Sequence, residues 1–154
     1  MARPRADSEI PAALRRLDLE GAVRFVSGID DDALVRLYAE AEVAVVPSLY
    51  EGFSLPAVQA MACGLPLLAT TAGALPEVVG RDGETGLLVE PGNPTALATA
   101  LDRLLQDAQL RNHLAQAGRS RALRLFNWKT CAEATAQQYR EVIGGRPVLR
   151  EDAA

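Results

Sequence analysis

Short apolar runs alternate with amphipathic segments along the first two thirds of the chain. The runs at residues 23–27, 43–46, 66–71 and 86–89 have the length and composition of strands that are buried on both faces of a parallel sheet. Residues 30–40, 56–63 and 75–79 lie between them and have features of helices, with an acidic start in the first and Pro at the first position of the second. The pattern predicts an α/β fold with a doubly wound, mostly parallel sheet.

The last third of the chain changes to a purely helical pattern. Residues 94–105 follow an Asn-Pro start and carry leucines on one face, and two more helices are predicted over 108–125 and 128–143. We expect Phe126 and Trp128 to pack the final helices onto the sheet. The predicted organisation is an N-terminal extension or helix over residues 1–20, one domain over 21–145 and a flexible tail over 146–154.

Composition narrows the function classes. The chain has 154 residues, enough for one domain, and a net charge of −4 with a pI of about 5.0, which disfavours nucleic-acid binding. It has no apolar run of ~18 residues and does not start like a signal peptide, so we expect a cytoplasmic protein. Cys63 and Cys131 lack zinc-site spacing, and we expect both to be buried thiols. The one histidine, His113, lies between polar neighbours and is expected on the surface.

The loop between the strand at 43–46 and the helix at 56–63 carries the most informative chemistry. Ligands of open α/β sheets bind at the carboxyl ends of the strands. There, Gly52 and Ser54 lie just before a helix N-terminus, where free backbone N–H groups attract phosphate. Glu51 would repel a bare phosphate but could accept hydrogen bonds from sugar hydroxyls. This mixture predicts a phosphorylated sugar as ligand.

The residues around this loop resemble a known family. The run P-S-x-x-E-G-F-S-L-P-A-V-Q-A-M-A-C-G-L-P at 47–66, with matching segments at 23–28, 74–78, 82–92 and 126–128, is similar to the retaining glycosyltransferases of family 4, the glycosyl transferases group 1. The resemblance covers most of the chain. It implies that the chain is part of the C-terminal, Rossmann-like domain of a GT-B fold.

The resemblance also implies roles at matching positions. Glu51 is the catalytic candidate and contacts the donor sugar, while Gln59 stands where the family has a second glutamate that binds the ribose. An amide accepts through one oxygen only, so we expect weaker donor binding. The other donor-binding candidates are the loop residues Gly52, Phe53, Ser54 and Leu55, the base-side residues Gly28 and Ile29, and Gly73 and Glu77.

The family mechanism needs no metal and no cofactor. Sugar leaves a nucleoside diphosphate donor with retention of configuration, through a transition state that resembles an oxocarbenium ion. Helix and loop N–H groups can stabilise the departing diphosphate without a metal ion.

Family enzymes have parts that find no match here. The N-terminal acceptor domain and the Gly-Arg and Lys positions that neutralise the diphosphate have no counterpart in the sequence. If the strand order follows 3-2-1-4-5-6, the runs at 23–27 and 43–46 are strands 3 and 4, and the two strands between them are missing. The two runs then pair directly, or a second chain supplies strands, or the exposed edge promotes self-association.

Three hypotheses about the function of the chain therefore stay open. The chain supplies the donor-binding half of a glycosyltransferase and needs a partner acceptor domain, or it binds a nucleotide or sugar nucleotide without transfer, or it is an inactive remnant. Any peripheral membrane association would come through the missing domain.

Overall fold

The computed structural model describes residues 9–145, so the predicted tail at 146–154 lies outside the described residues. The chain forms two compact units, Met1–Leu37 and Tyr38–Ala154. Helix α1 (Ile10–Arg16) belongs to the first unit and lies within the predicted N-terminal extension. Helix α2 (Asp31–Glu40) begins in the first unit, where the Asp30 carboxylate accepts a hydrogen bond of 2.8 Å from the Ala33 amide. This acidic cap starts the helix where the sequence predicts it.

The second unit contains a three-stranded parallel sheet. Its strands β1 (Ala44–Val46), β2 (Leu67–Thr70) and β3 (Leu87–Val89) lie in the order β1-β2-β3. The register pairs Val45 with Leu68, and Ala69 with Leu88. This arrangement confirms the predicted α/β class, and its order is the one that strands 4, 5 and 6 of a doubly wound sheet require.

The strand predicted over residues 23–27 is wrong. The structure gives these residues no strand hydrogen bonding, and Val23 and Val26 are exposed. A strand exists only through a ladder with a neighbour. An apolar run of five residues supplies the β-type composition but not the ladder, so 23–27 is an irregular segment of the first unit.

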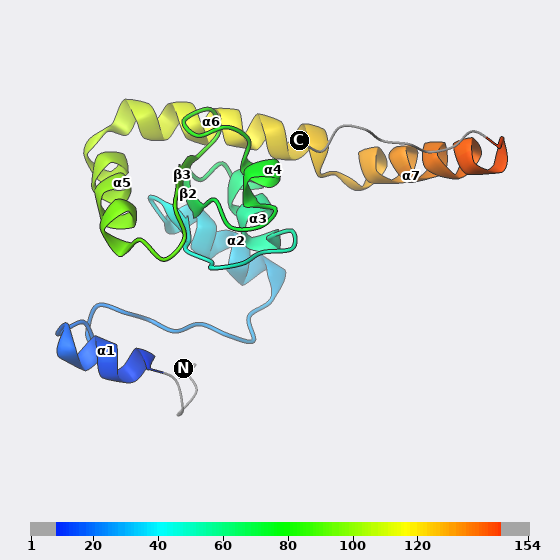
Figure 1. The fold of residues 1–154 in the computed structure, drawn as a ribbon. Coiled ribbons are helices and arrows are strands. Elements are labelled where there is room, and N and C mark those ends of the chain that lie inside the picture. The colour runs from blue at the N-terminus through cyan, green and yellow to red at the C-terminus, as the bar shows by residue number, and fades with distance from the viewer. Residues whose placement is uncertain (1–8, 146–154) are drawn as a thin grey trace. The chain divides into compact units, whose positions relative to one another are not determined.

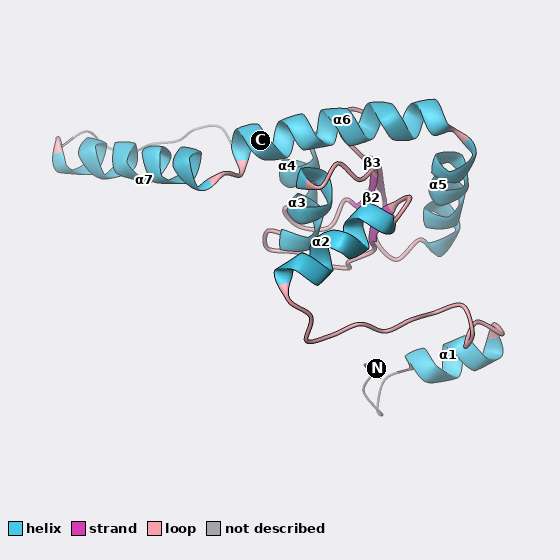
Figure 2. Cartoon of the chain, turned by 180° about the vertical axis from the view of Figure 1, so that it is seen from behind, coloured by secondary structure: helices cyan, strands magenta, loops and turns pink. Residues whose placement is uncertain are grey.

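Helices cover both faces of the sheet (Figures 1 and 2). Helices α3 (Leu55–Ala62) and α4 (Leu75–Val79) bury Met61 and Leu75 against the face that carries Leu67 and Ala69. On the other face, Leu68 packs with Leu104 of α5 (Pro94–Gln106). Because side chains alternate along β2, its residues pack into two separate hydrophobic cores, one on each face of the sheet.

Helix α6 (Ala108–Leu125) belongs to both cores, through Leu114 on the α5 side and Ala122 on the α3 side. Three of its arginines also donate hydrogen bonds to the last turns of three other helices, whose carbonyls lack partners within the helix. The acceptors are Leu104 and Leu105 for Arg111 (2.6 and 2.7 Å), Ala62 for Arg119, and Glu77 and Val78 for Arg121 (2.7 and 2.9 Å). One helix thus fixes the ends of α3, α4 and α5.

Helix α7 (Trp128–Ile143) is capped by Asn127, whose side chain accepts a hydrogen bond from the Thr130 amide. It has no buried residue. The prediction that Trp128 packs on the sheet is wrong, because its side chain is 91% exposed. The prediction that both thiols are buried is wrong for Cys131, which is exposed on α7, and only partly met by Cys63, which is half-buried. Among residues 9–145, no helix is long and apolar enough to cross a bilayer.

Candidate functional site

The loops after β1 and β2 lie side by side at the carboxyl edge of the sheet and are tied together by hydrogen bonds. The buried hydroxyl of Thr70, at the end of β2, donates to the Ser48 carbonyl at 2.6 Å. The Ala74 amide, just before α4, donates to the Glu51 carbonyl at 2.9 Å. Two segments far apart in the sequence therefore form one edge, at the place where parallel sheets bind ligands.

Gly73 is the point of closest approach between the two loops. Its φ is +54°, in the left-handed region that favours glycine, and a Cβ there would lie 2.1 Å from the Glu51 carbonyl oxygen. Only glycine fits without moving one loop. The sequence picked out Gly73 as donor-binding, and in the structure it holds the backbone of Glu51.

Gly52 differs from Gly73, because the protein itself does not require a glycine there. A Cβ at Gly52 would meet nothing within 4 Å, and its backbone is not in the left-handed region. The residue is exposed at the loop surface. A glycine that neither packing nor backbone conformation demands leaves room for a ligand to approach the chain.

The carboxylate of Glu51 is held by its own loop. The Ser48 hydroxyl donates to its Oε1 atom at 2.8 Å, and Glu51 is half-buried. The structure thus places the catalytic candidate at the edge of the sheet with one carboxylate oxygen fixed. Leu49 and Tyr50 between these two residues are exposed.

Ser54 precedes α3 and has an unusual environment. It is 4% exposed, its backbone is left-handed with φ +46°, and its hydroxyl has no hydrogen-bond partner in the described part of the chain. It does not cap α3. A buried hydroxyl without a partner costs about 1–3 kcal/mol. The helix N-terminus beside it carries N–H groups without intrahelical partners, which favour an anion.

Aromatic residues from other elements support this loop. The rings of Phe53 and Phe126 meet edge to face, with 5.6 Å between centroids, so the predicted packing role of Phe126 is directed at the loop before α3. The Tyr38 hydroxyl donates a long hydrogen bond of 3.5 Å to the Pro56 carbonyl. Burial, with a smaller effect from Cys63, raises the pKa of Tyr38.

The other donor-binding candidates are less closely associated with this edge. Leu55 and Gln59 are exposed on α3, the helix that begins after Ser54. Glu77 is exposed on α4, and its backbone carbonyl accepts from Arg121. Gly28, with φ +64°, and the exposed Ile29 belong to the first unit, and their role at the base stays a prediction.

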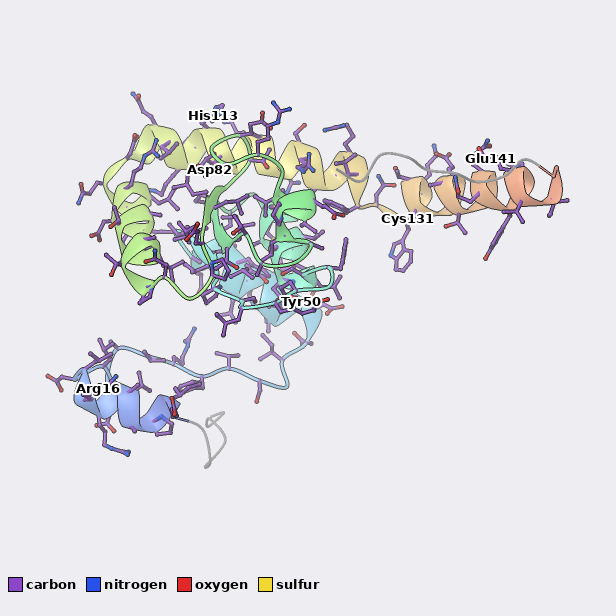
Figure 3. The ribbon with its side chains drawn as sticks, viewed as in Figure 1. Arg16, Tyr50, Asp82, His113, Cys131 and Glu141 are labelled. Atoms are coloured by element: carbon purple, nitrogen blue, oxygen red, sulfur yellow. The ribbon has the colours of Figure 1, made fainter. Side chains whose placement is uncertain are left out.

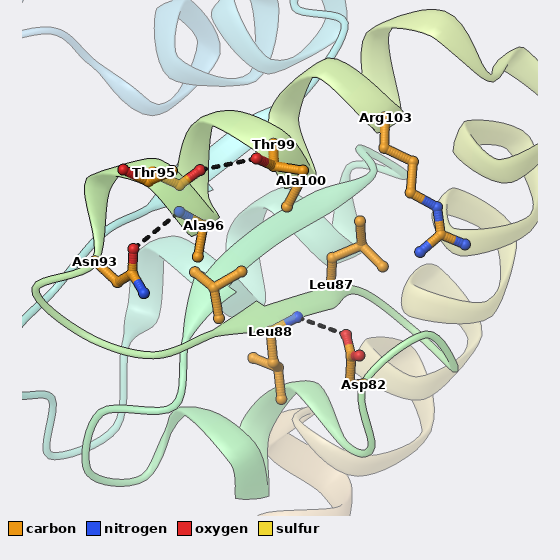
Figure 4. A pocket seen from close by; sticks show the side chains of 10 residues that line it. Asp82, Leu87, Leu88, Asn93, Thr95, Ala96, Thr99, Ala100 and Arg103 are labelled. Atoms are coloured by element: carbon orange, nitrogen blue, oxygen red, sulfur yellow. Dashed lines mark hydrogen bonds between the residues drawn. The ribbon is translucent and has the colours of Figure 1, made fainter.

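A small cavity reaches the candidate site, and a larger groove lies beside β3. A cavity of about 180 Å³ is lined by Pro47, Leu49, Thr70 and Glu90 at the carboxyl edge. A larger groove of about 590 Å³ lies between β3 and α5 (Figure 4). There Asp82 accepts from the Leu88 amide at 2.8 Å and Asn93 accepts from the Ala96 amide at 2.9 Å, so these polar groups complete the strand edge and the helix start.

The sequence predicts that neither His113 nor a metal ion takes part in the chemistry of the site. His113 is exposed on α6 (Figure 3), as the sequence predicts. Among the described residues, no three His, Cys, Asp or Glu side chains lie close enough to hold a metal ion. The absence of a metal requirement stays a prediction.

Residues 8–121 match the sequence profile of the family described as glycosyl transferases group 1. The chain belongs to this family. It is 47% identical over 130 residues to the MMP alpha-(1->4)-mannosyltransferase of Mycolicibacterium hassiacum, a match that covers 84% of this chain and 32% of that protein. The chain thus spans about a third of the length of the curated relatives it matches.

Solved structures agree with this assignment. The sucrose-phosphate synthase of Thermosynechococcus elongatus has a TM-score of 0.81 and 41% identity, covering 89% of this chain and 34% of that one. Anabaena Alr3699/HepE, solved in complex with UDP-glucose, has a TM-score of 0.79 and 28% identity over 86% of this chain and 36% of that one. The predicted resemblance to the C-terminal domain of GT-B glycosyltransferases is confirmed.

Thr70 and Tyr38 also support the candidate site, and neither is among the residues that the sequence predicts for it. Thr70 stands at the end of the predicted strand at 66–71, and a threonine directly after a buried apolar run was the available signal. Tyr38 gave no such signal, because its contact with Pro56 joins residues 18 positions apart.

Proposed function

We propose that this chain is the donor-binding half of a retaining family 4 glycosyltransferase, which transfers a sugar from a nucleoside diphosphate sugar to an acceptor. The observation that carries the proposal is Ser54. Its hydroxyl is buried and unpartnered among the described residues at the start of α3, beside Gly52, which leaves the loop backbone accessible. A diphosphate oxygen is the partner that would satisfy both the hydroxyl and the free N–H groups of the helix.

The diphosphate is the leaving group, so its stabilisation is the main task of this half of the site. Negative charge grows on it as its bond to the anomeric carbon of the sugar breaks and a bond to the acceptor oxygen forms. The N-terminus of α3, the loop amides at Gly52 to Leu55 and the Ser54 hydroxyl meet this charge without a metal ion or cofactor.

Glu51 lies next to this phosphate position and has a carboxylate oxygen, Oε2, besides the one that Ser48 binds. A carboxylate accepts hydrogen bonds from sugar hydroxyls. Glu51 therefore orients the donor sugar. The carboxylate also favours the positive charge that develops at the sugar ring in an oxocarbenium-like transition state.

Relatives support a nucleotide sugar as donor. Anabaena Alr3699/HepE was solved with UDP-glucose, and relatives of this chain are a mannosyltransferase and glycogen synthases. The acceptor would bind to a domain other than this donor-binding half, and we place the reaction in the cytoplasm.

Calorimetric titration of the chain tests the proposal. Nucleoside diphosphates of uridine, guanosine and adenosine are titrated alone and as their glucose or mannose conjugates. At least one sugar conjugate should bind, and more tightly than its free diphosphate because Glu51 adds a contact. Folded protein that binds none of them at millimolar concentration would reject the proposal.

Replacing Gly52 with alanine should weaken binding of the nucleoside diphosphate about tenfold, because the methyl group lies where the ligand approaches the loop. The free energy of unfolding should change by no more than about 0.5 kcal/mol, since nothing in the protein lies within 4 Å. Gly21 has the same open surroundings in the first unit, so Gly21→Ala is the matched control. Equal binding by the two variants would show that Gly52 does not face the ligand.

Replacing Gln59 with glutamate, the residue that the family has at this position, should tighten nucleotide binding. A Gln59→Glu carboxylate can accept from both ribose hydroxyls, and hydrogen bonds to a charged group contribute about 1.5–3 kcal/mol, or roughly ten- to a hundredfold in affinity. Titration with a nucleoside diphosphate and with inorganic pyrophosphate, which has no ribose, separates this effect from a general charge effect. Unchanged nucleotide affinity would remove Gln59 from the ribose site.

A second candidate function is a module that binds a sugar nucleotide without transferring the sugar. The amide at Gln59, exposed on α3, favours it because the chain gives up a charged ribose contact. Mixing the chain with a family acceptor domain and measuring sugar transfer distinguishes the two candidates.

A further inference from the structure

A chain of two hydrogen bonds leads from the core of the sheet to the Glu51 carboxylate. Thr70, 3% exposed at the end of β2, donates to the Ser48 carbonyl at 2.6 Å. The Ser48 hydroxyl then donates to Glu51 Oε1 at 2.8 Å. The first bond fixes the backbone of Ser48, and the second fixes the side chain of Glu51. Neither Thr70 nor Ser48 is among the residues that the sequence assigns to the donor.

We propose that Thr70 and Ser48 are positioning residues that orient the Glu51 carboxylate toward the donor sugar. This inference rests on the proposed role of Glu51. A free glutamate side chain samples many rotamers, and ordering it on binding costs affinity. The Ser48 hydroxyl orders the carboxylate before the ligand arrives and leaves Oε2 to accept from the sugar.

The backbone of Glu51 is fixed independently of the two hydrogen bonds made by Thr70 and Ser48. The Ala74 amide donates to the Glu51 carbonyl, and Gly73 packs against the same peptide. Loss of the Ser48 hydroxyl should therefore free the carboxylate without releasing the loop. This separation gives the proposal a signature that a merely structural role lacks: the sugar conjugate should lose affinity while the free nucleoside diphosphate should not.

The test is calorimetric titration of the full chain with UDP-glucose and UDP, or with the conjugate and diphosphate pair that the wild type binds best. Ser48→Ala should bind the conjugate about tenfold more weakly and the diphosphate as before. Glu51→Gln should show the same loss, and the double variant should lose no more than either single one. Ser48→Thr, which keeps the hydroxyl, should keep the affinity.

Thr70 is tested with a conservative pair of variants. Thr70→Val removes the hydroxyl at constant shape and should reproduce the selective loss, while Thr70→Ser should not. Thr99 makes a similar hydrogen bond to the Thr95 carbonyl on α5, so Thr99→Val is the matched control and should leave both affinities unchanged. Equal loss of conjugate and diphosphate affinity, or additive losses in the double variant, would overturn the proposal.

A measurement without ligand separates failure of this inference from failure of the proposed function. If the wild type binds no nucleotide, the proposed function fails, and amide hydrogen exchange over residues 48–51 judges the anchoring by Thr70. Exchange there should be about tenfold faster in Thr70→Val than in Thr70→Ser or Thr99→Val. Equal exchange in all three would overturn the anchoring.

Discussion

Gly73→Ala should destabilise the second unit by about 3–4 kcal/mol, one of the two largest effects expected in this chain. The added Cβ would stand 2.1 Å from the Glu51 carbonyl oxygen, far inside van der Waals contact, and the positive φ adds a backbone cost. One loop must move, which breaks the hydrogen bond from the Ala74 amide to Glu51. Urea unfolding measures the change, and nucleotide affinity should fall with it.

The control for this variant is Gly83→Ala. Gly83 also has a positive φ, of +79°, but a Cβ there meets nothing within 4 Å. It should cost only about 1 kcal/mol, the backbone term alone. Equal destabilisation by the two variants would mean that the approach of the two loops is not as close as described.

Met61→Ala should cost about 2–5 kcal/mol, because it opens a cavity under the helix that carries the site. Met61 is fully buried on α3, and its Cγ lies 3.5 Å from where a Cβ of Gly118 on α6 would be. The glycine at 118 lets α6 pack closely against α3, so Met61 fills the space between the two helices. Thermal and urea unfolding of Leu123→Ala, a truncation of an exposed leucine on α6, provides the reference, with a change within about 0.5 kcal/mol. A similar loss in both variants would contradict the described packing of α3 on α6.

Local signals predicted most of the fold. The bounds of α4, α6 and α7 follow the sequence prediction, and for α6 and α7 the reason is that Asp107 and Asn127 cap the helices with side chains that accept from backbone amides. The strand predicted at 23–27 does not form, because strand formation depends on a neighbour that a local pattern cannot reveal. Trp128 is exposed for a related reason, since burial of an aromatic side chain depends on what its helix packs against.

The residues of the candidate site could also be predicted only in part from the sequence. Glu51, Gly52, Ser54 and Gly73 stand out in the sequence, and in the structure the loops that carry them meet at the carboxyl edge. The position of Thr70 after an apolar run is visible in the sequence, but its partner is not, because the hydrogen bond to Ser48 spans 22 positions. The sequence gives more functional weight to Gly52 than to Gly73, but it does not show what surrounds either residue. Only the atoms that surround each Cα in the fold separate Gly73, which the protein needs, from Gly52, which has open space beside it.

Titration of Ser54→Ala beside the wild type tests the central claim, that the start of α3 binds a diphosphate, most directly. Removing a buried, unpartnered hydroxyl should leave the ligand-free chain as stable as before or more stable by up to about 1 kcal/mol. The same change should weaken binding of a nucleoside diphosphate about tenfold, because the phosphate loses a hydrogen bond. A variant of unchanged stability that binds the diphosphate as tightly as the wild type would contradict the account.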